Sequence, residues 1–431
     1  TGAEVLLRTS VVAVEGDQVV LVTDGQSART VTARRLVLAP GAHDRPVAFP
    51  GWTLPGVITA GGLQTLAKTQ RVLPGERILF AGAGPVALAF PAQLAGYGAN
   101  IVAALDSGPP PRAGDIARIA RAAPGNIDLL RDAVRYRAAL LRRRIPVRNR
   151  RIVLRAEGDG RVERVVYAKV GVDWRVIPGT QQAIDVDVLC VGYGFVPSLE
   201  LMRLVGCEFD YDENLGGHVV RRDEWLRTTV DNVTVDNMTV DNVAADNVAA
   251  DNVAVDNVYV AGDGAGVEGS YVAIDEGRIA GLAAAMDAGS ITASEADAAT
   301  VSARRRLARR RALAAATNRL YRVGPGIFDL ATNDTVVCRC ENVRARSIDA
   351  AIETTADINV VKAHTRAGMG PCQGRNCQRH IAAMIARRHG RSVADVALAT
   401  PRMPVRPVPI GALADHSIAG PTLFLAEGTN P

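Results

Sequence analysis

A chain of 431 residues, of which 48% are apolar and only 4% aromatic, is long enough to bury the cores of two or three domains. This composition is usual for an α/β protein, and it excludes a disordered chain or a small domain held together by disulfides. A net charge of +5 is small for this length, so charge alone does not indicate a nucleic-acid-binding protein.

Targeting patterns and cysteine usage both bear on where the protein works. The sequence contains no run of about 18 apolar residues, and its amino end lacks the basic-then-apolar pattern of a signal peptide. Four of the six cysteines gather near the carboxyl end, as in a metal site and unlike a secreted disulfide framework. We therefore expect a cytoplasmic protein with no transmembrane segment.

The first part of the chain predicts strands. Apolar residues alternate from Glu4 onward and again over 11–22, and residues 36–41 predict a buried strand that ends in a tight turn at Gly41. Because this alternation begins within a few residues of Thr1, we expect the first domain to lack its leading element.

Residues 77–106 predict a complete βαβ unit: a strand, a glycine turn, a helix rich in alanine and leucine, and a second strand. A helix around 130–141 and strands near residues 152, 162 and 185–191 follow. This order is consistent with a doubly wound α/β domain.

The glycine turn of this unit, Gly82-Ala-Gly84-Pro85-Val-Ala87, has the pattern of a dinucleotide fingerprint. Gly82 allows the tight turn, Gly84 lets the backbone approach a pyrophosphate, and Ala87 permits close helix packing. Asp106, 24 residues past Gly82, can accept hydrogen bonds from an adenosine ribose. The pattern predicts NAD or another adenine nucleotide here, and a purely structural turn is the alternative.

The dipeptide Asp-Asn recurs every five residues between Asp231 and Asp256. Such a run resembles a pentapeptide-repeat coil, but so short a coil could not bury a core of its own. We expect a surface insertion over 231–257 that arose by duplication.

The next segment ends a buried strand in the turn Gly262-Asp263-Gly264, and a helix is predicted after it. Glycines let a ligand approach the backbone, and the Asp263 carboxylate can accept a hydrogen bond from a hydroxyl group. The turn therefore predicts contact with the ribityl and pyrophosphate groups of a flavin, with an ordinary Gly-Asp turn as the alternative.

A helical connector is predicted next, and it contains the arginine run from Arg304 to Arg311. Leu313 and Leu320 lie seven residues apart, which is typical of a helix with one solvated basic face. Binding of this run to an acidic partner or to nucleic acid is the alternative. Residues 391–431 predict an extended Pro-rich tail.

Cys338 and Cys340 are followed, after 31 residues, by Cys372 and Cys377, and this is the most specific pattern in the chain. Zinc sites usually pair their ligands as Cys-x2-Cys, whereas iron-sulfur centres accept varied spacings. The spacing favours a 2Fe-2S cluster, and a zinc site or no metal at all are the alternatives. Cys190, in a predicted buried strand, is expected to pack in the core.

These motifs, in this order, resemble the flavoproteins with two dinucleotide-binding domains, and specifically the alpha subunits of opine oxidase, hydrogen cyanide synthase and dye-linked proline or hydroxyproline dehydrogenases. Ala39-Pro-Gly41 is similar to the family's Ala-Thr-Gly turn, and Val191 to Pro197 is similar to the strand end that returns the chain to the flavin domain. Gly262-Asp263 is similar to the flavin-binding motif. The four clustered cysteines are similar to the ligands of a domain of the bacterioferritin-associated ferredoxin type.

The resemblance implies an α/β fold with two Rossmann-like dinucleotide-binding domains and a small helical carboxyl-terminal 2Fe-2S domain. The implied boundaries are an incomplete FAD-binding domain at 1–72 and 195–290, an NAD or adenine-nucleotide domain at 73–194, the helical connector at 291–334, the 2Fe-2S domain at 335–390 and the tail at 391–431. The family opens with its own glycine fingerprint and acidic residue for the adenosine half of FAD, and neither is present before Thr1. We therefore expect this chain to hold FAD weakly or not at all.

The resemblance further implies one subunit of a hetero-oligomeric amino-acid, imino-acid or opine dehydrogenase. A partner flavoprotein subunit of the amino-acid oxidase type would oxidise a small amine substrate, and this chain would pass the electrons on through flavin and cluster. Two other functions stay open: an architectural subunit with a non-redox nucleotide, and a self-contained NAD(P)H-dependent FAD reductase. No His, Ser or carboxylate constellation predicts a proton-abstracting site in this chain.

Overall fold

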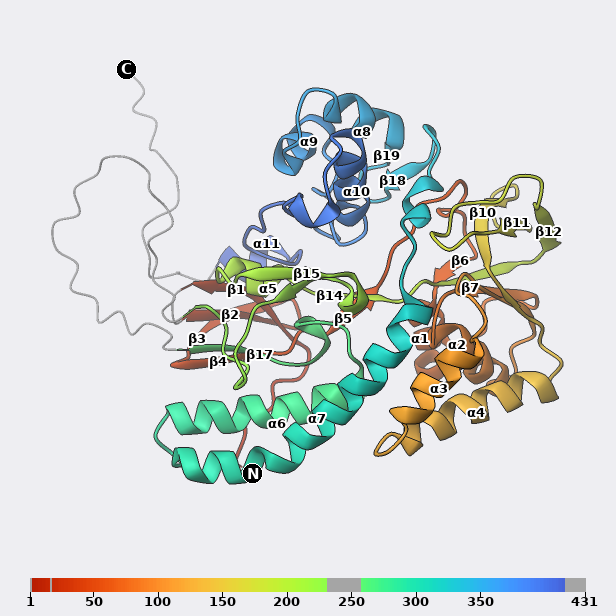
Figure 1. The fold of residues 1–431 in the computed structure, drawn as a ribbon. Coiled ribbons are helices and arrows are strands. Elements are labelled where there is room, and N and C mark those ends of the chain that lie inside the picture. Colours follow the sequence, from red (N-terminus) through yellow and green to blue (C-terminus); the bar gives the residue numbers. More distant parts are fainter. Residues whose placement is uncertain (1, 16–17, 231–256, 415–431) are drawn as a thin grey trace, which may run out of the picture.

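The structure, a computed structural model, describes residues 2–15, 18–230 and 257–414 (Figure 1). A strand-rich first domain and a middle α/β domain lie side by side, and a small helical domain sits against both. The pentad insertion expected at 231–257 lies outside the described residues except for Asn257, and so does the end of the Pro-rich tail beyond residue 414.

The middle domain is built on a five-stranded parallel sheet with the order β6-β13-β7-β8-β9. Its strands are β6 (Val57–Thr59), β7 (Ile78–Gly82), β8 (Ile101–Asp106), β9 (Val147–Asn149) and β13 (Val188–Gly192). β7 and β13 are buried at every position, as expected for parallel strands that are covered on both faces. Because β6 precedes residue 73, the sheet includes a strand from the segment expected in the first domain.

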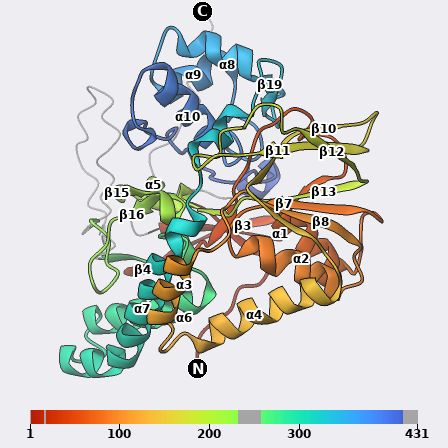
Figure 2. The same ribbon diagram turned by 45° about the vertical axis from the view of Figure 1, so that its right-hand side comes forward.

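Helices cover one face of this sheet, and an antiparallel sheet covers the other (Figure 2). The helices of the middle domain are α1 (Ala60–Thr65), which continues into the π-helix η1 (Leu66–Gln70), α2 (Val86–Gly96), α3 (Ala113–Arg121) and α4 (Ile127–Arg142). The antiparallel strands are β10 (Arg151–Glu157), β11 (Arg164–Lys169) and β12 (Gln182–Asp185). The doubly wound arrangement is therefore found on one face alone. β10 and β11 pair antiparallel because their connection is too short for a helical crossover.

The first domain consists of small sheets that join distant parts of the chain. An antiparallel sheet contains β1 (Thr9–Glu15), β2 (Gln18–Thr23) and β3 (Ser27–Thr32). Three two-stranded sheets pair β4 (Arg35–Leu38) with β17 (Asn257–Val260), β5 (Ala42–Asp44) with β14 (Phe195–Pro197), and β15 (Phe209–Asp212) with β16 (Gly217–Val220). Short helices in this domain are α5 (Glu200–Leu204), η2 (Glu213–Leu215) and η3 (Gly262–Gly264). The strand predicted from Glu4 begins later, at Thr9.

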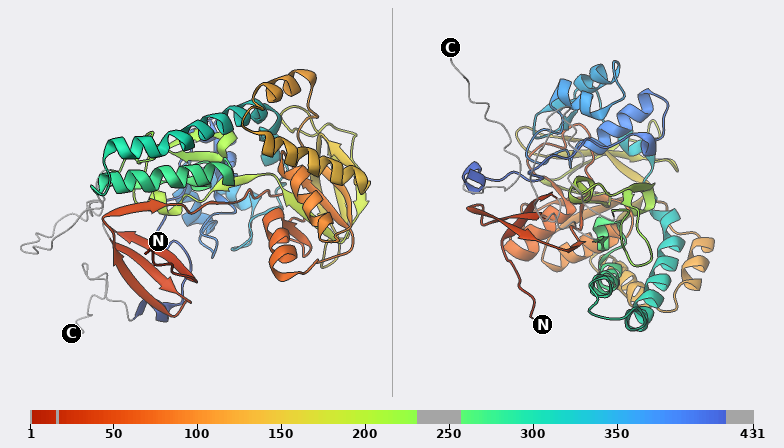
Figure 3. Two further views of the ribbon diagram at one scale, coloured as in Figure 1. Left: turned by 90° about the horizontal axis from the view of Figure 1, so that it is seen from below. Right: turned by 90° about the vertical axis from the view of Figure 1, so that its left-hand side faces the viewer.

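Two long antiparallel helices, α6 (Ser270–Asp287) and α7 (Ala293–Tyr321), lie side by side along the first domain (Figures 1 and 3). Thr292 and Glu295 form a capping box that satisfies the free amides at the start of α7. The carboxyl end of α7 reaches the middle domain near α3, so one helix connects the two domains (Figure 3).

The arginine run on α7 is only in part a solvated basic face: Arg305 and Arg309 are exposed, whereas other members of the run form ion pairs. Arg310 forms an ion pair with Asp128 of α4 at 2.6 Å, and Arg311 forms one with Glu276 of α6 at 2.6 Å. The run from Arg304 to Arg311 therefore joins α7 to both domains. Its partners come from distant segments, so helical periodicity could not reveal them.

The carboxyl-terminal domain is small and mostly helical. Its elements are β18 (Val336–Cys338), β19 (Val343–Arg344), α8 (Ala345–Ile352), α9 (Ile358–Thr365), α10 (Gln378–Arg388) and η5 (Val393–Asp395). The preceding η4 (Pro325–Asp329) packs in the core of the middle domain, and α11 (Ile410–Ala414) at the other end packs on the β1-β2-β3 sheet of the first domain. Arg375 pairs with Glu200 of α5 at 3.0 Å, which docks the domain on the first domain. Among the described helices, none is long and apolar enough to cross a membrane.

Candidate functional site

The structure brings the four cysteines of the carboxyl-terminal domain together in two contacting pairs. Cys377 and Cys338 share a thiol hydrogen bond, and Cys340 and Cys372 share the second. Cys377 also lies within the electrostatic range of Cys340 and Cys372, so the two pairs are neighbours. The turn after β18 and the loop between α9 and α10 thus place their cysteines face to face.

Backbone amides favour negative charge on these sulfurs. The Cys338 sulfur accepts the N–H of Gly368 at 3.5 Å and the N–H of Glu341. The hydrogen bond from Cys377, aided by these amides, lowers the pKa of Cys338 to about 6, while the same bond raises the pKa of Cys377. Cys372 likewise accepts backbone amides from the turn that follows it. Burial nevertheless raises the pKa of Cys372, so among the three thiols of this site whose pKa is shifted only Cys338 favours the thiolate.

Exposure differs among the four thiols. Cys338 and Cys377 are buried, Cys372 is half-buried and Cys340 is exposed. A methyl group on Gly370 would lie 2.3 Å from the Cβ of Cys340, so only a glycine lets the loop approach this closely. Within residues 2–15, 18–230 and 257–414, no three His, Cys, Asp or Glu side chains meet closely enough to share a single metal ion.

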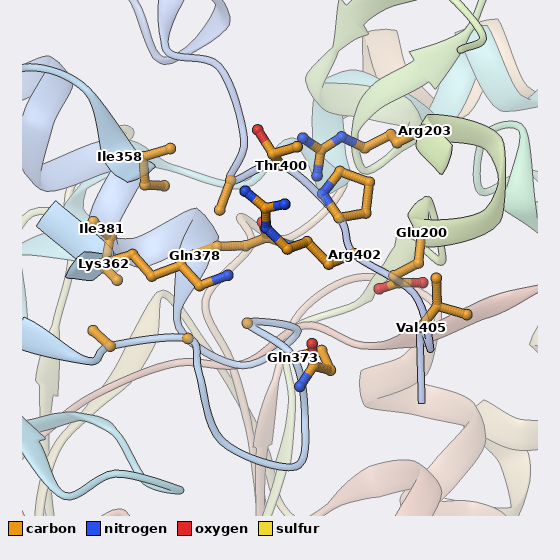
Figure 4. A pocket seen from close by; sticks show the side chains of 15 residues that line it. Glu200, Arg203, Ile358, Lys362, Gln373, Gln378, Ile381, Thr400, Arg402 and Val405 are labelled. Atoms are coloured by element: carbon orange, nitrogen blue, oxygen red, sulfur yellow. The ribbon is translucent and has the colours of Figure 1, made fainter. Parts of the chain in front are cut away.

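A small pocket lies beside the cysteine loop, where the carboxyl-terminal domain, α5 and the segment after η5 meet (Figure 4). Arg203, Lys362 and Arg402 bring three positive charges to it, and Gly374 of the cysteine loop forms part of its wall. Its volume of about 30 Å³ leaves room for only one or two water molecules. A flavin or an amine substrate needs a few hundred Å³, so this pocket is not a substrate site.

Two glycine turns lie side by side in the first domain, at the carboxyl ends of the parallel strands β4 and β17. Gly41 and Gly262 adopt positive φ angles of 71° and 74°. A methyl group on Gly264 would lie 2.8 Å from Pro40, so a glycine is needed for the two turns to touch. A methyl group on Gly41 would meet nothing within 4 Å, which leaves open space in front of this turn. The carboxyl ends of parallel strands are the usual binding edge for nucleotides.

Asp263 braces the second of these turns. One of its carboxylate oxygens, Oδ1, accepts the amides of Glu268 at 3.0 Å and Gly269 at 2.7 Å. Its other oxygen has no hydrogen-bond partner among the described residues. Asp263 therefore holds the loop and still offers one acceptor.

Glu276, which the sequence places in a predicted helix with no assigned role, is hydrogen-bonded to the same turn. Its side chain is 1% exposed and accepts the amide of Gly262 at 2.7 Å. Arg222 donates two hydrogen bonds to it, at 2.7 and 2.8 Å, and Arg311 donates one at 2.6 Å. The only signal in the sequence was a carboxylate on a helix rich in alanine. The network ties β17, α6 and α7 to the turn.

The predicted dinucleotide turn lies between β7 and α2, as expected. A methyl group on Gly82 would lie 2.1 Å from the carbonyl oxygen of Gly192, so this glycine is required by the neighbouring strand. Gly84 has a positive φ of 73°, Pro85 precedes the first residue of α2, and Ala87 is buried against the sheet. The local geometry is thus that of the fingerprint.

Asp106 faces its own turn. It is 8% exposed and accepts the amide of Gly108 at 2.8 Å, the side-chain amide of Asn149 at 3.2 Å, and the amide of Gly84. Burial raises the pKa of Asp106 to about 6, against the lowering effect of these amides. The carboxylate predicted to bind ribose is therefore already hydrogen-bonded to Gly108 and Asn149.

Tyr321, the last residue of α7, packs on this turn, and sequence reasoning did not find it. A methyl group on Gly84 would lie 3.2 Å from the Tyr321 ring atom Cδ1. Burial raises the pKa of Tyr321, and the nearby Asp106 charge adds to the effect. No local pattern could reveal this contact, because it depends on where a long helix ends.

The raised pKa of Asp106 gives a prediction for Asp106→Asn. A carboxyl whose folded pKa exceeds its unfolded value stabilises the fold below the unfolded pKa and loses that contribution as pH rises through the folded value. Wild type should therefore lose about 3 kcal/mol between about pH 4 and pH 7 through this group, and the variant should not. Urea unfolding at both pH values measures this. Parallel pH dependences for the two proteins would contradict it.

Comparisons with known proteins agree with this architecture. The sequence profile of the pyridine nucleotide-disulphide oxidoreductase family matches residues 1–235, and that of the sarcosine oxidase A3 domain matches residues 332–416. Hydrogen cyanide synthase subunit HcnB of Pseudomonas aeruginosa is 32% identical over 407 residues, which are 94% of this chain and 81% of that protein. The A subunit of opine oxidase from Rhizobium meliloti is 30% identical over 421 residues, which are 96% of this chain and 83% of that protein.

A solved structure shares the fold. L-proline dehydrogenase from P. horikoshii superimposes with a TM-score of 0.60 at 19% identity, and the match covers 94% of this chain and 64% of that chain. The resemblance inferred from the motifs is confirmed. The chain belongs to the family of flavoprotein oxidoreductases that includes hydrogen cyanide synthase subunit HcnB and the A subunit of opine oxidase.

Proposed function

We propose that this chain is the electron-transfer subunit of a heteromeric dehydrogenase or oxidase that acts on an amino acid, an imino acid or an opine, and that it passes electrons on through a 2Fe-2S cluster and a flavin for which it provides only part of the binding site. A flavin takes up electrons in pairs and releases them singly, and a 2Fe-2S cluster carries one electron at a time. The relatives named as subunits of hydrogen cyanide synthase and opine oxidase support this proposal.

The observation that carries the proposal is the short connection between the cysteine loop and the flavin turn. Arg379, two residues after Cys377, donates a hydrogen bond to the carbonyl oxygen of Gly216 at 2.9 Å. In the adjacent η2, the carbonyl oxygen of Leu215 accepts the amide of Val267 at 2.8 Å, and Val267 lies in the loop that follows the Gly262 turn. One turn of chain thus contacts a residue close in sequence to each of the two candidate redox sites.

The four cysteines fit a binuclear cluster. Each iron of a 2Fe-2S cluster takes two protein ligands, and the chain offers two adjacent thiol pairs. Cys338 and Cys377 would hold one iron, and Cys340 and Cys372 would hold the other. The amides around Cys338 and Cys372 would stabilise the negative charge of the ligated sulfurs.

The two glycine turns of the first domain fit a flavin. Gly41 faces open space, and Gly264 lets the second turn pack against Pro40 beside it. The free carboxylate oxygen of Asp263 is placed to accept a ribityl hydroxyl. These residues would bind and orient the flavin.

Asp263→Ala is expected to weaken further the weak flavin binding expected of this chain and to destabilise the loop by about 1–3 kcal/mol, because two amides lose their acceptor. Asp263→Asn keeps an acceptor for those amides and loses only the charged oxygen. It should fold normally and bind flavin about tenfold more weakly. Flavin released on denaturation measures both. Wild-type flavin content in the alanine variant would contradict the assignment.

The Gly82 turn, with Gly84, Pro85, Ala87 and Asp106, is proposed as a site for NAD or another adenine nucleotide that has no redox role. We assign no electron-transfer step to it, because Tyr321 packs on Gly84 and the Asp106 carboxylate is already hydrogen-bonded to Gly108 and Asn149. This favours an electron-transfer subunit over a self-contained NADH-dependent reductase. NADH should therefore fail to bleach the bound flavin, whereas an amine donor should bleach it in the complex with the partner.

The partner of this chain is proposed to be a flavoprotein subunit of the amino-acid oxidase type, which would bind and oxidise the amine. A reducible cluster in the purified complex would separate this role from a purely architectural one. Steady oxidation of an amine by this chain alone would contradict the proposal that the partner subunit carries out the oxidation.

A further inference from the structure

In a dinucleotide fingerprint, the second glycine lacks a side chain so that a pyrophosphate can approach the backbone. In this chain the space beside Gly84 is filled by the chain itself. A methyl group on Gly84 would lie 3.2, 3.3 and 3.4 Å from the Cδ1, Cγ and Cβ atoms of Tyr321. The aromatic ring therefore lies where the fingerprint leaves room for a ligand.

The backbone at the end of α7 also lies against Gly108, on the Asp106 side of the site. A methyl group on Gly108 would lie 3.1 Å from the carbonyl oxygen of Leu320. That carbonyl belongs to the last turn of α7, where the helix dipole carries partial negative charge. It makes the site unfavourable for a phosphate while α7 ends here.

We propose that Tyr321 is a built-in plug of the second dinucleotide site, and that an adenine nucleotide with two or three phosphates binds there only after the last turn of α7 moves aside. This inference rests on the proposed assignment of a nucleotide site to the Gly82 turn. The plug makes nucleotide affinity depend on the position of α7, which also carries the ion pairs to both domains.

Only the residues around Tyr321 are expected to move, because the chain is anchored by contacts both before and after this residue. Upstream, Arg310 and Arg311 anchor α7 through their ion pairs. Downstream, a methyl group on Gly324 would lie 2.5 Å from the ring of Trp174, and Ile327 is buried in the core of the middle domain. Movement is therefore confined to the last turn of α7, and the segment that follows leads through η4 to the cysteine domain.

Calorimetric titration with ATP and, separately, with NADH tests the plug in wild type, Tyr321→Ala and Tyr321→Phe. The alanine variant should bind about tenfold or more tightly than wild type, the factor expected when the open form is a tenth or less of the molecules. Tyr321→Phe keeps the ring and should behave as wild type. Adding Asp106→Ala to Tyr321→Ala should remove the gain. Hydrogen exchange over residues 316–322 should rise when wild type is saturated with the tighter nucleotide.

Three outcomes overturn the proposal, and they differ. Equal affinity in wild type and Tyr321→Ala, sensitive to Asp106→Ala, would show a working nucleotide site without a plug. If a folded Tyr321→Ala protein binds no nucleotide, the Gly82 turn is not a nucleotide site. The proposed nucleotide assignment then fails together with the plug. Unchanged hydrogen exchange at saturation would also exclude movement of α7.

Discussion

Replacing Cys377 with alanine is expected to remove iron and acid-labile sulfide almost completely from the protein. Cys377 is a buried free thiol that lies next to Cys338 and close to Cys340 and Cys372. Its loss is therefore expected to disrupt the whole proposed ligand set. The two remaining cysteines of the chain, Cys190 and Cys207, are buried in other domains and cannot replace it. Iron and sulfide analysis, with EPR of the reduced protein, measures the loss.

A matched control is Cys207→Ser, which alters a buried cysteine of the first domain. It should keep full iron and sulfide content. A normal rhombic EPR signal in Cys377→Ala would refute the cluster assignment, and loss of iron in both variants would show that misfolding is the cause.

Glu276→Ala is expected to lower the free energy of unfolding by about 3–5 kcal/mol, the range for removing one partner of a buried ion pair. Arg222, whose side chain is 13% exposed, would lose the acceptor of two hydrogen bonds, and the Gly262 amide would lose its partner. Because the flavin turn begins at Gly262, flavin content should fall as well. Urea unfolding and flavin release measure the two effects.

Glu224→Ala provides the comparison. Glu224 is 76% exposed and pairs with Arg304 at 3.2 Å, so its removal should change the unfolding free energy by no more than about 1 kcal/mol. Similar losses for Glu224→Ala and Glu276→Ala would mean that the buried network does not stabilise the turn.

The cysteine site shows what spacing can predict. The gathering of four cysteines in one small domain followed from the sequence, because their spacing is local information. Their pairing did not follow, since it depends on how the loop before α10 meets the turn after β18. Cys190 lies buried in β13, as its predicted strand indicated.

The nucleotide turn shows the opposite limit. The strand, turn and helix around Gly82 follow from residues close in the sequence, and the structure has them where the pattern predicts. The contacts of Gly84 with Tyr321 and Asp106 arise from packing between distant segments. A fingerprint can therefore be complete in sequence and closed in three dimensions.

The boundaries between domains also depend on pairing between distant strands, which the hydrophobic periodicity of the sequence does not reveal. β6 joins the middle sheet because it pairs with β13, which lies far along the chain. The ion pairs of the arginine run likewise depend on the meeting of α7 with α4 and α6. Sequence patterns within a single helix or strand predicted that helix or strand. Contacts between distant helices and strands determined the domain to which each belongs.

Anaerobic reduction of the purified complex by an amine donor, such as L-proline or an opine, tests most directly whether electrons pass through the cluster of this chain. As the flavin bleaches, the EPR signal of a reduced 2Fe-2S cluster should appear, and electron delivery to an external dye should be lost in the complex that carries Cys377→Ala. Full dye reduction by that variant, or flavin bleaching with no cluster signal in wild type, would contradict the proposed role.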